Sequence, residues 1–188
     1  MKLPLRTINI PLSLLFLIIF SSGSALATPF DRDASNFLSN IGIYVFLAAG
    51  PVREWTGGGP GAHTKAFRDL DAELASGLVA EGLKQFVREE RPDGSGNDSF
   101  PSGHATVSFA LAATESAFHP SEAPYWYGGA ALISASRVRL GKHYWKDVLA
   151  GTVIGLGMAQ LSISQPHGLI LTPFIRSDGG GVEVHSIF

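Results

Sequence analysis

Apolar residues along the chain gather into runs at helical spacing, and glycines or prolines separate one run from the next. Runs of this kind, each closed by Gly or Pro, are typical of α-helices. The pattern predicts five helices, at residues 34–55, 64–90, 104–118, 125–139 and 143–163. The last run is rich in Gly and Ala, which permits close contact between helices.

The first residues differ from this pattern. Lys2 and Arg6 precede a short apolar run at 12–20, and small residues lead to Ala25-Leu26-Ala27. This order predicts a signal peptide over residues 1–27, with an uncleaved anchor helix as the alternative. We expect cleavage because the run is short for a membrane span. The remaining chain, 28–188, would then be secreted across the inner membrane into the periplasm or cell envelope.

The C-terminal tail also departs from helical spacing. Segments 169–175 and 182–187 flank a glycine-rich stretch at 177–181, which is typical of a small β-hairpin. The predicted fold class is therefore all-α, a bundle of about five helices with a short C-terminal β-hairpin. A length of 188 residues favours a single domain.

Composition narrows the possible functions. Hydrophobic residues make up 45% of the chain and charged residues 16%, the net charge is −2, and cysteine is absent. Thiol nucleophiles and thiolate metal sites are thereby excluded. Without a bulk basic field, we expect no nucleic-acid partner.

The apolar pattern also bears on membrane insertion. Residues 148–163 carry no charge but fall short of the ~20 residues that span a bilayer. Other apolar stretches are interrupted by Glu81, Lys84 and Glu115. Shorter runs more often mark buried core helices, so the sequence favours a soluble or peripheral protein at a membrane surface over an integral one.

The first chemically distinctive segment places Lys84, Arg88 and Arg91 four and three residues apart. On a continuous helix they would share one face, where their mutual repulsion makes sense if an anion binds there. The alternative is a solvated basic edge balanced by Glu89 and Glu90.

The second segment, Ser102-Gly103-His104, opens an apolar helix. Ser102 is a natural N-cap, the N–H groups of the first turn form an anion site, and Gly103 permits close approach to the backbone. The alternative is an ordinary capped helix start with an incidental histidine.

The third segment contains Arg137, His143 and Asp147. The i, i+4 spacing of His143 and Asp147 lets the carboxylate hold one imidazole nitrogen and leaves the other free. Arg137 precedes the turn at Gly141 and can reach the same anion. The alternative is a surface His–Asp pair.

Taken together, the three segments resemble the type 2 phosphatidic acid phosphatase superfamily. Its signature, K-x6-RP followed by PSGH and SR-x5-H-x3-D, is filled in order between Lys84 and Asp147. The chain departs from many members near the signature histidine, where it has Arg139, Lys142, Trp145 and Lys146. These departures bear on the choice of substrate.

The resemblance implies a role for each signature residue. His143 would attack phosphorus, Asp147 would orient it, and His104 would protonate the leaving oxygen. The residues implied in phosphate binding are Lys84, Arg91, Ser102, Gly103 and Arg137. Because three cations supply the charge, no metal or cofactor is expected. The remaining histidines, His63, His119, His167 and His185, are scattered along the chain and predict no metal cluster.

The predicted function is an extracytoplasmic phosphatase acting on a phosphomonoester or pyrophosphate, with a lipid favoured over a small phosphoester. Two alternatives remain, a vanadium-dependent haloperoxidase, although such enzymes are longer, and a non-catalytic binder of phosphate headgroups. Cations at Arg139, Lys142 and Lys146 favour a substrate with more than one negative charge. Ordinary surface solvation is the alternative explanation for them.

Overall fold

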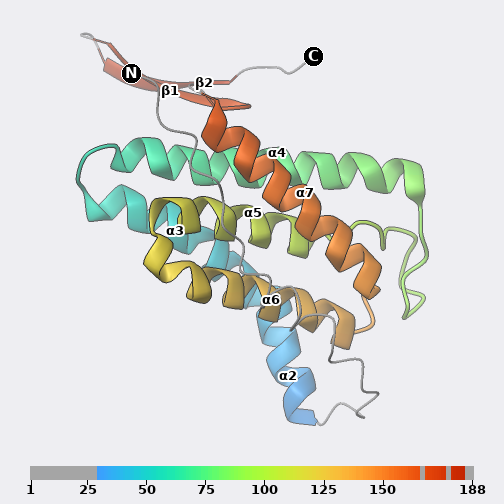
Figure 1. Ribbon diagram of the computed structural model, residues 1–188. Coiled ribbons are helices and arrows are strands. Elements are labelled where there is room, and N and C mark those ends of the chain that lie inside the picture. Colours follow the sequence, from blue (N-terminus) through green and yellow to red (C-terminus); the bar gives the residue numbers. More distant parts are fainter. Residues whose placement is uncertain (1–28, 166–167, 177–178, 185–188) are drawn as a thin grey trace.

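The chain folds into a bundle of helices with a two-stranded hairpin at one corner (Figure 1). The computed structural model describes residues 29–165, 168–176 and 179–184. Its elements are α2 (Pro29–Phe37), the π-helical turn η1 (Leu38–Gly42), α3 (Ile43–Gly57), α4 (Ala62–Val87), α5 (Gly103–Phe118), the 3-10 turn η2 (Pro120–Glu122), α6 (Ala123–Arg139), α7 (Trp145–Ser164), β1 (Leu171–Arg176) and β2 (Gly179–Val184). The predicted fold class is confirmed, while the predicted signal peptide, 1–27, lies outside the described residues.

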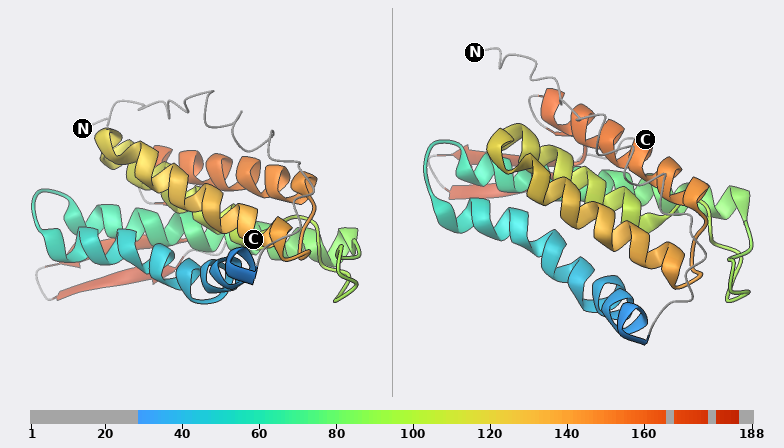
Figure 2. Two further views of the ribbon diagram at one scale, coloured as in Figure 1. Left: turned by 90° about the horizontal axis from the view of Figure 1, so that it is seen from below. Right: turned by 60° about the horizontal axis from the view of Figure 1, so that its bottom comes forward.

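Helix α5 is the centre of the bundle, in contact with α4, α6 and α7 (Figures 1 and 2). Its contact with α7 depends on two glycines. A Cβ on Gly155 would stand 2.2 Å from the Thr106 carbonyl oxygen, and one on Gly151 would stand 2.6 Å from that of Ser102. The two backbones therefore touch, as the Gly and Ala content of the last helix predicts. This contact holds the N-terminal ends of α5 and α7 together.

The end of α4 corrects one sequence prediction. The helix stops at Val87 rather than at residue 90, and Arg88 caps it in the left-handed region at φ 47°. Arg88 is exposed, and its Nε donates to the Gln85 carbonyl. The expectation that Lys84, Arg88 and Arg91 share one helix face is therefore wrong. Pro92 disfavours helical backbone at Arg91, and the chain has already turned back toward α5.

The first predicted helix is continuous but irregular. Between α2 and α3 the backbone widens into the π-helical turn η1. π-Helical turns are rare and occur often at functional sites. Here the turn contains Ser39, whose side chain is buried while its neighbours Leu38 and Asn40 are not.

The hairpin is tied to the bundle by one carboxylate. Asp71 of α4 accepts hydrogen bonds from the backbone N–H groups of Leu169, Ile170 and Leu171 at 2.6–2.8 Å, and from Ser162 Oγ at 2.6 Å. β1 and β2 then pair antiparallel, as the tail predicts. Residues 177–178 and 185–187 of the predicted hairpin lie outside the described ranges.

Much of the bundle surface is apolar. Two helical stretches, Arg32–Gly57 and Trp145–Ser164, are long and apolar enough to cross a membrane, with 28% and 39% of their most apolar windows buried in the bundle. Exposed large apolar side chains on α3, α4 and α7 include Tyr44, Val45, Val52, Trp55, Leu74, Leu78, Phe86, Val153 and Leu161. A surface of this extent is unusual for a freely soluble monomer.

Candidate active site

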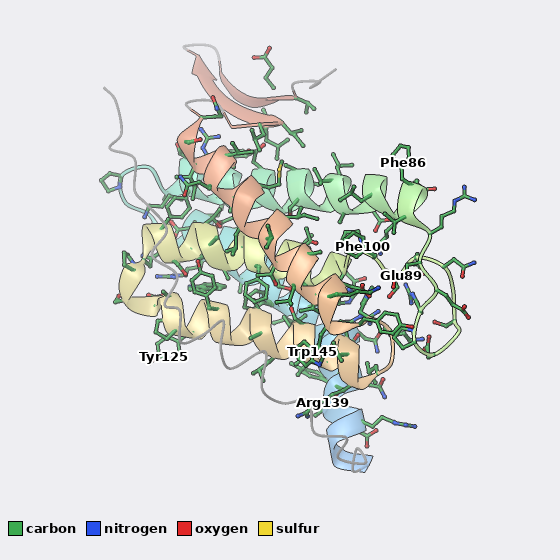
Figure 3. The ribbon with its side chains drawn as sticks, turned by 45° about the vertical axis from the view of Figure 1, so that its right-hand side comes forward. Phe86, Glu89, Phe100, Tyr125, Arg139 and Trp145 are labelled. Carbon is green, nitrogen blue, oxygen red and sulfur yellow. The ribbon has the colours of Figure 1, made fainter. Side chains whose placement is uncertain are left out.

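Four helix termini meet at one end of the bundle, namely the last turns of α4 and α6 and the first turns of α5 and α7 (Figure 1). Figure 3 shows Phe86, Glu89, Phe100, Arg139 and Trp145 at this end, with Tyr125 at the other. The three signature segments, separated in the sequence, are thereby brought together in space.

The N-terminus of α5 forms the floor of the site. Ser102 is fully buried and caps the helix, its Oγ accepting from the Ala105 N–H at 3.5 Å. A Cβ on Gly103 would stand 3.8 Å from Lys84 Nζ, so the lysine ammonium lies close to the first helical residue. A cation beside the free N–H groups of a helix start is an arrangement that binds phosphate.

His143 is held by the main chain of the loop that precedes α5. Its Nδ1 lies 2.7 Å from the Ser99 carbonyl oxygen, and its side chain is 2% exposed. A carbonyl oxygen only accepts, so Nδ1 carries the proton and Nε2 keeps its lone pair. His143 is thus placed as a nucleophile through Nε2.

Asp147 reaches His143 less directly than the i, i+4 spacing predicts. Its Oδ2 lies 3.8 Å from His143 Nδ1, longer than a hydrogen bond. The same oxygen accepts from Ser99 Oγ at 2.5 Å and from the Tyr144 N–H at 2.8 Å. Since α7 begins at Trp145, His143 precedes the helix rather than opening it. Asp147 therefore supports the histidine through Ser99, while its negative charge remains near the ring.

His104 and Arg137 share a partner that the sequence does not reveal. His104 Nε2 donates to the Ser39 carbonyl oxygen at 2.9 Å, and Arg137 Nη1 donates to Ser39 Oγ. Ser39 belongs to η1, 65 residues before His104 along the chain. The π-helical turn thus positions one predicted acid–base residue and one predicted phosphate ligand at once.

Burial and positive charge keep both histidines neutral. Burial lowers the pKa of His143 to about 3, with further lowering by Arg137, Lys84 and Arg91 and an opposing contribution from the Ser99 carbonyl. Burial likewise lowers the pKa of His104 to about 4, and the same three cations contribute. The charges of all three cations therefore act on both rings. Burial and the charge of Arg91 also lower the pKa of Arg137.

Arg91 is already paired with a carboxylate. Its Nη2 lies 2.6 Å from Asp98 Oδ2 in the loop between α4 and α5. Although partial burial acts in the opposite direction, the hydrogen bond and charge of Arg91 lower the pKa of Asp98. The pair orients the Arg91 guanidinium within the loop and leaves its other N–H groups for a bound anion.

Two of the additional cations near His143 are also paired. Lys142 Nζ lies 2.6 Å from Asp93 Oδ2, and Lys146 Nζ lies 2.5 Å from Glu89 Oε1. Both acids belong to the α4–α5 loop, so these pairs join the loop to the segment between α6 and α7. The contacts favour a structural role for the two lysines over a field that attracts multiply charged substrates.

The structure gathers all the predicted site residues at one end of the bundle and adds two. Ser39 and Ser99 hold the two histidines through carbonyl oxygens, which any residue type provides, and their hydroxyls contact Arg137 and Asp147. No residue pattern could therefore have identified them, although Ser99 lies only three positions before Ser102.

Comparisons with known proteins agree with this arrangement. Lipid A 1-phosphatase from Porphyromonas gingivalis is 33% identical over 96 residues, 49% of this chain and 21% of that protein. Lipid A 1-phosphatase from Rhizobium johnstonii is 31% identical over 102 residues, 46% of this chain and 42% of that protein. The chain thus spans less than half the length of these relatives.

Solved structures share the fold. The crystal structure of Aquifex aeolicus LpxE matches with a TM-score of 0.63 and 21% identity, over 82% of this chain and 94% of that one. A transmembrane PAP2 type phosphatidylglycerolphosphate phosphatase from Bacillus subtilis matches with a TM-score of 0.50 and 20% identity, over 77% and 88%. The model of the PAP2 superfamily matches residues 35–170, a range that contains every signature residue. The chain belongs to the PAP2 superfamily.

Proposed function

We propose that this protein is a phosphatase that needs no metal for catalysis and works through a phosphohistidine. The observation that carries the proposal is the pair of buried, neutral histidines, each held by a carbonyl oxygen and both within the field of Lys84, Arg91 and Arg137. A simple anion binder needs the cations but not two oriented imidazoles.

In the first step, His143 Nε2 attacks phosphorus and the bond to the leaving oxygen breaks. The negative charge of the bound phosphate favours protonation of His104, which gives its Nδ1 proton to that oxygen, and the oxygen departs as an alcohol. The three cations, the Ser102 hydroxyl and the Gly103 N–H bind the equatorial oxygens, where transition-state charge gathers. Asp147 stabilises the positive charge that develops on His143.

In the second step, water attacks the phosphorus of the phosphohistidine. His104, now neutral, takes a proton from the water as its oxygen bonds to phosphorus. The N–P bond breaks, inorganic phosphate leaves, and His143 regains its lone pair. Since His104 ends the cycle protonated, both groups return to their starting states.

For the substrate, we propose a phosphorylated lipid of the cell envelope. Two supports are the name lipid A 1-phosphatase carried by relatives and the exposed apolar side chains on α3, α4 and α7. They favour a bundle in contact with lipid, more strongly than the sequence pattern does. The proposed periplasmic address rests on residues 1–27, which lie outside the described part of the chain.

Turnover by the purified full-length chain tests the proposal. p-Nitrophenyl phosphate and a panel of lipid phosphates, including lipid A 1-phosphate and phosphatidic acid in detergent, should release inorganic phosphate. Vanadate should inhibit more strongly than phosphate because its five-coordinate geometry resembles the transition state. Binding of these compounds without turnover would indicate a headgroup binder. Bromide oxidation with vanadate and peroxide, without phosphate release, would indicate a haloperoxidase.

A further inference from the structure

A second cluster of buried polar side chains lies at the opposite end of the bundle from the histidine pair, where α3 joins α4 and α5 joins α6 (Figure 1). Its members are Glu54 on α3, Asp69 on α4, Glu115 on α5, and His119 directly after α5. All three carboxylates are at least 94% buried, with exposed fractions of 6%, 0% and 0%. Glu115 follows His104 by 11 residues on one helix, so about 16 Å of helix separates the two places.

In each carboxylate, one oxygen contacts a residue outside the cluster and the other lies inside it. One oxygen is held from outside the cluster: Glu54 Oε2 by Lys65 Nζ at 3.5 Å, Glu115 Oε2 by Arg53 Nη1 at 3.2 Å, and Asp69 Oδ1 by Thr114 Oγ1 at 2.5 Å. Supporting contacts of this kind orient carboxylates that bind a metal through the other oxygen.

The other oxygens lie inside the cluster. Glu54 Oε1 lies 2.5 Å from His119 Nε2. Among the residues that the structure describes, Glu115 Oε1 and Asp69 Oδ2 accept no hydrogen bond. Both lie beside Gly50, 3.0 and 3.2 Å from the point where a Cβ on that residue would stand. Two fully buried acceptors side by side are costly unless a proton or a cation lies between them.

The acidic side chains in and around the cluster outnumber the basic ones by two. Glu54, Asp69, Glu115 and Glu122 face Arg53 and Lys65, with Glu122 bound to Arg53 at 2.6 Å. Burial raises the pKa of Asp69 and of Glu115, so a proton shared between them is the alternative to a bound ion. With all four carboxylates ionised and His119 neutral, these side chains carry a net charge of −2. A buried excess of this size is costly unless a cation compensates it.

We propose that this cluster is a binding site for one divalent transition-metal ion, held by His119, Glu54 and Glu115 with Asp69 beside them. One oxygen from each glutamate and a ring nitrogen of His119 lie within 4.8 Å of one another, so modest movement brings them to the ~2.0–2.2 Å that zinc requires. One imidazole with carboxylates suits Zn²⁺ or Mn²⁺ better than Ca²⁺ or Mg²⁺. On binding, the His119 Nε2 proton is released to solvent and its bond to Glu54 is replaced.

The site would act on the fold rather than on the reaction. Its ligands come from α3 and from the end of α5, and Asp69 of α4 lies beside them. The ion would therefore join α3 to α5 close to the glycine-rich loop that follows α3. An ion that binds only the folded chain raises the free energy of unfolding.

Metal content and thermal unfolding of the untagged full-length protein test the proposal. After treatment with EDTA and desalting, the protein is incubated with Zn²⁺ or Mn²⁺, and bound metal is measured by mass spectrometry. We expect one tightly held equivalent and a rise in Tm of about 5 °C or more at a hundredfold excess over Kd. His119→Gln and Glu115→Gln should each lose both effects. His119 is partly exposed, so its replacement by an amide of similar size should be tolerated.

Two controls separate this site from other histidines. His63→Gln removes an exposed imidazole that stacks on Trp55 at the same end of the bundle, and it should keep the equivalent. A His104→Gln, His143→Gln double variant should keep it as well. If the unsubstituted protein binds no stoichiometric metal and shows no Tm shift, the proposal is wrong. One proton shared between Asp69 and Glu115 would then account for the cluster. Equal binding by the His119→Gln protein would overturn it too.

Discussion

His143 and His104 are each held by a main-chain carbonyl oxygen, from Ser99 and Ser39 respectively. The bonds fix opposite ring nitrogens, Nδ1 of His143 and Nε2 of His104, and so determine which nitrogen of each ring is left for chemistry. The surrounding cations stabilise the neutral rings in the free protein. The negative charge of a bound phosphate opposes the field of these cations. It therefore favours protonation of His104, the histidine that does not attack phosphorus.

Replacement of each histidine should separate their roles. His143→Ala removes the nucleophile and should abolish turnover of every substrate. His104→Ala should still be phosphorylated by p-nitrophenyl phosphate, because nitrophenolate leaves without a proton, but water would lack its base. We expect a burst of about one equivalent of nitrophenol and acid-labile phosphate on the protein. Rapid-quench kinetics measures both. If the His143→Ala protein, rather than the His104→Ala protein, accumulates phosphate, the roles assigned to the two histidines are reversed.

The pKa shifts make a second prediction at this scale. The profile of kcat/KM reports the free enzyme, in which burial and, to a smaller extent, the nearby cations lower the pKa of His104 to about 4. The profile of kcat reports the complex, where the phosphate anion raises that pKa. The alkaline limb of kcat should therefore lie roughly one to three pH units above that of kcat/KM. Coincident limbs in stopped assays from about pH 3 to 9 would contradict this account.

Helices could be predicted from the sequence because apolar spacing and Pro or Gly breaks are local signals. The ends of α5 and α6 fall within two residues of the expected positions. The π-helical turn could not be predicted, because the contacts that accompany it join Ser39 to His104 and Arg137 from distant segments. The site residues could be identified by their motif. The carbonyl oxygens of Ser39 and Ser99 that support them belong to the main chain, so no sequence motif identifies them.

The role of η1 predicts the effect of one hydroxyl. Ser39→Ala keeps the carbonyl that holds His104 but removes the hydroxyl that accepts from buried Arg137. Leaving a buried donor without an acceptor costs ~1–3 kcal/mol of free energy. We expect KM for p-nitrophenyl phosphate to rise about tenfold, equivalent to ~1.4 kcal/mol, while the pH profile stays the same. Ser116→Ala is a matched control, because this buried hydroxyl donates to the Ala112 carbonyl far from the site. Equal KM values for the two variants would contradict a positioning role for Ser39.

The loop between α4 and α5 supports a further prediction. Because Asp93 already compensates the charge of Lys142, Lys142→Gln should change turnover of pyrophosphate and of a monoester by the same factor, within about twofold. Steady-state kinetics with both substrates gives the ratio. A selective loss of pyrophosphate turnover would instead show that Lys142 recognises a second phosphate group.

At the scale of the whole molecule, the two ends of the bundle differ in what their buried polar groups are suited to do. One end gathers cations around two histidines, and the other gathers carboxylates around His119. Helix α5 runs between them and is buried over most of its length. An anion that reacts and a cation that stabilises the fold would thus occupy opposite ends of one helix, each matched to the charge that surrounds it.

This separation predicts that chelation acts on stability and not on catalysis. Lys84, Arg91 and Arg137 supply the positive charge that a catalytic metal would otherwise provide, so initial rates in EDTA should equal those in buffer at 25 °C. If the far end holds a metal ion, the same treatment should lower Tm. Rates and melting curves of one EDTA-treated sample measure both effects. A folded sample that loses activity and regains it with a divalent ion would show that the metal takes part in the reaction.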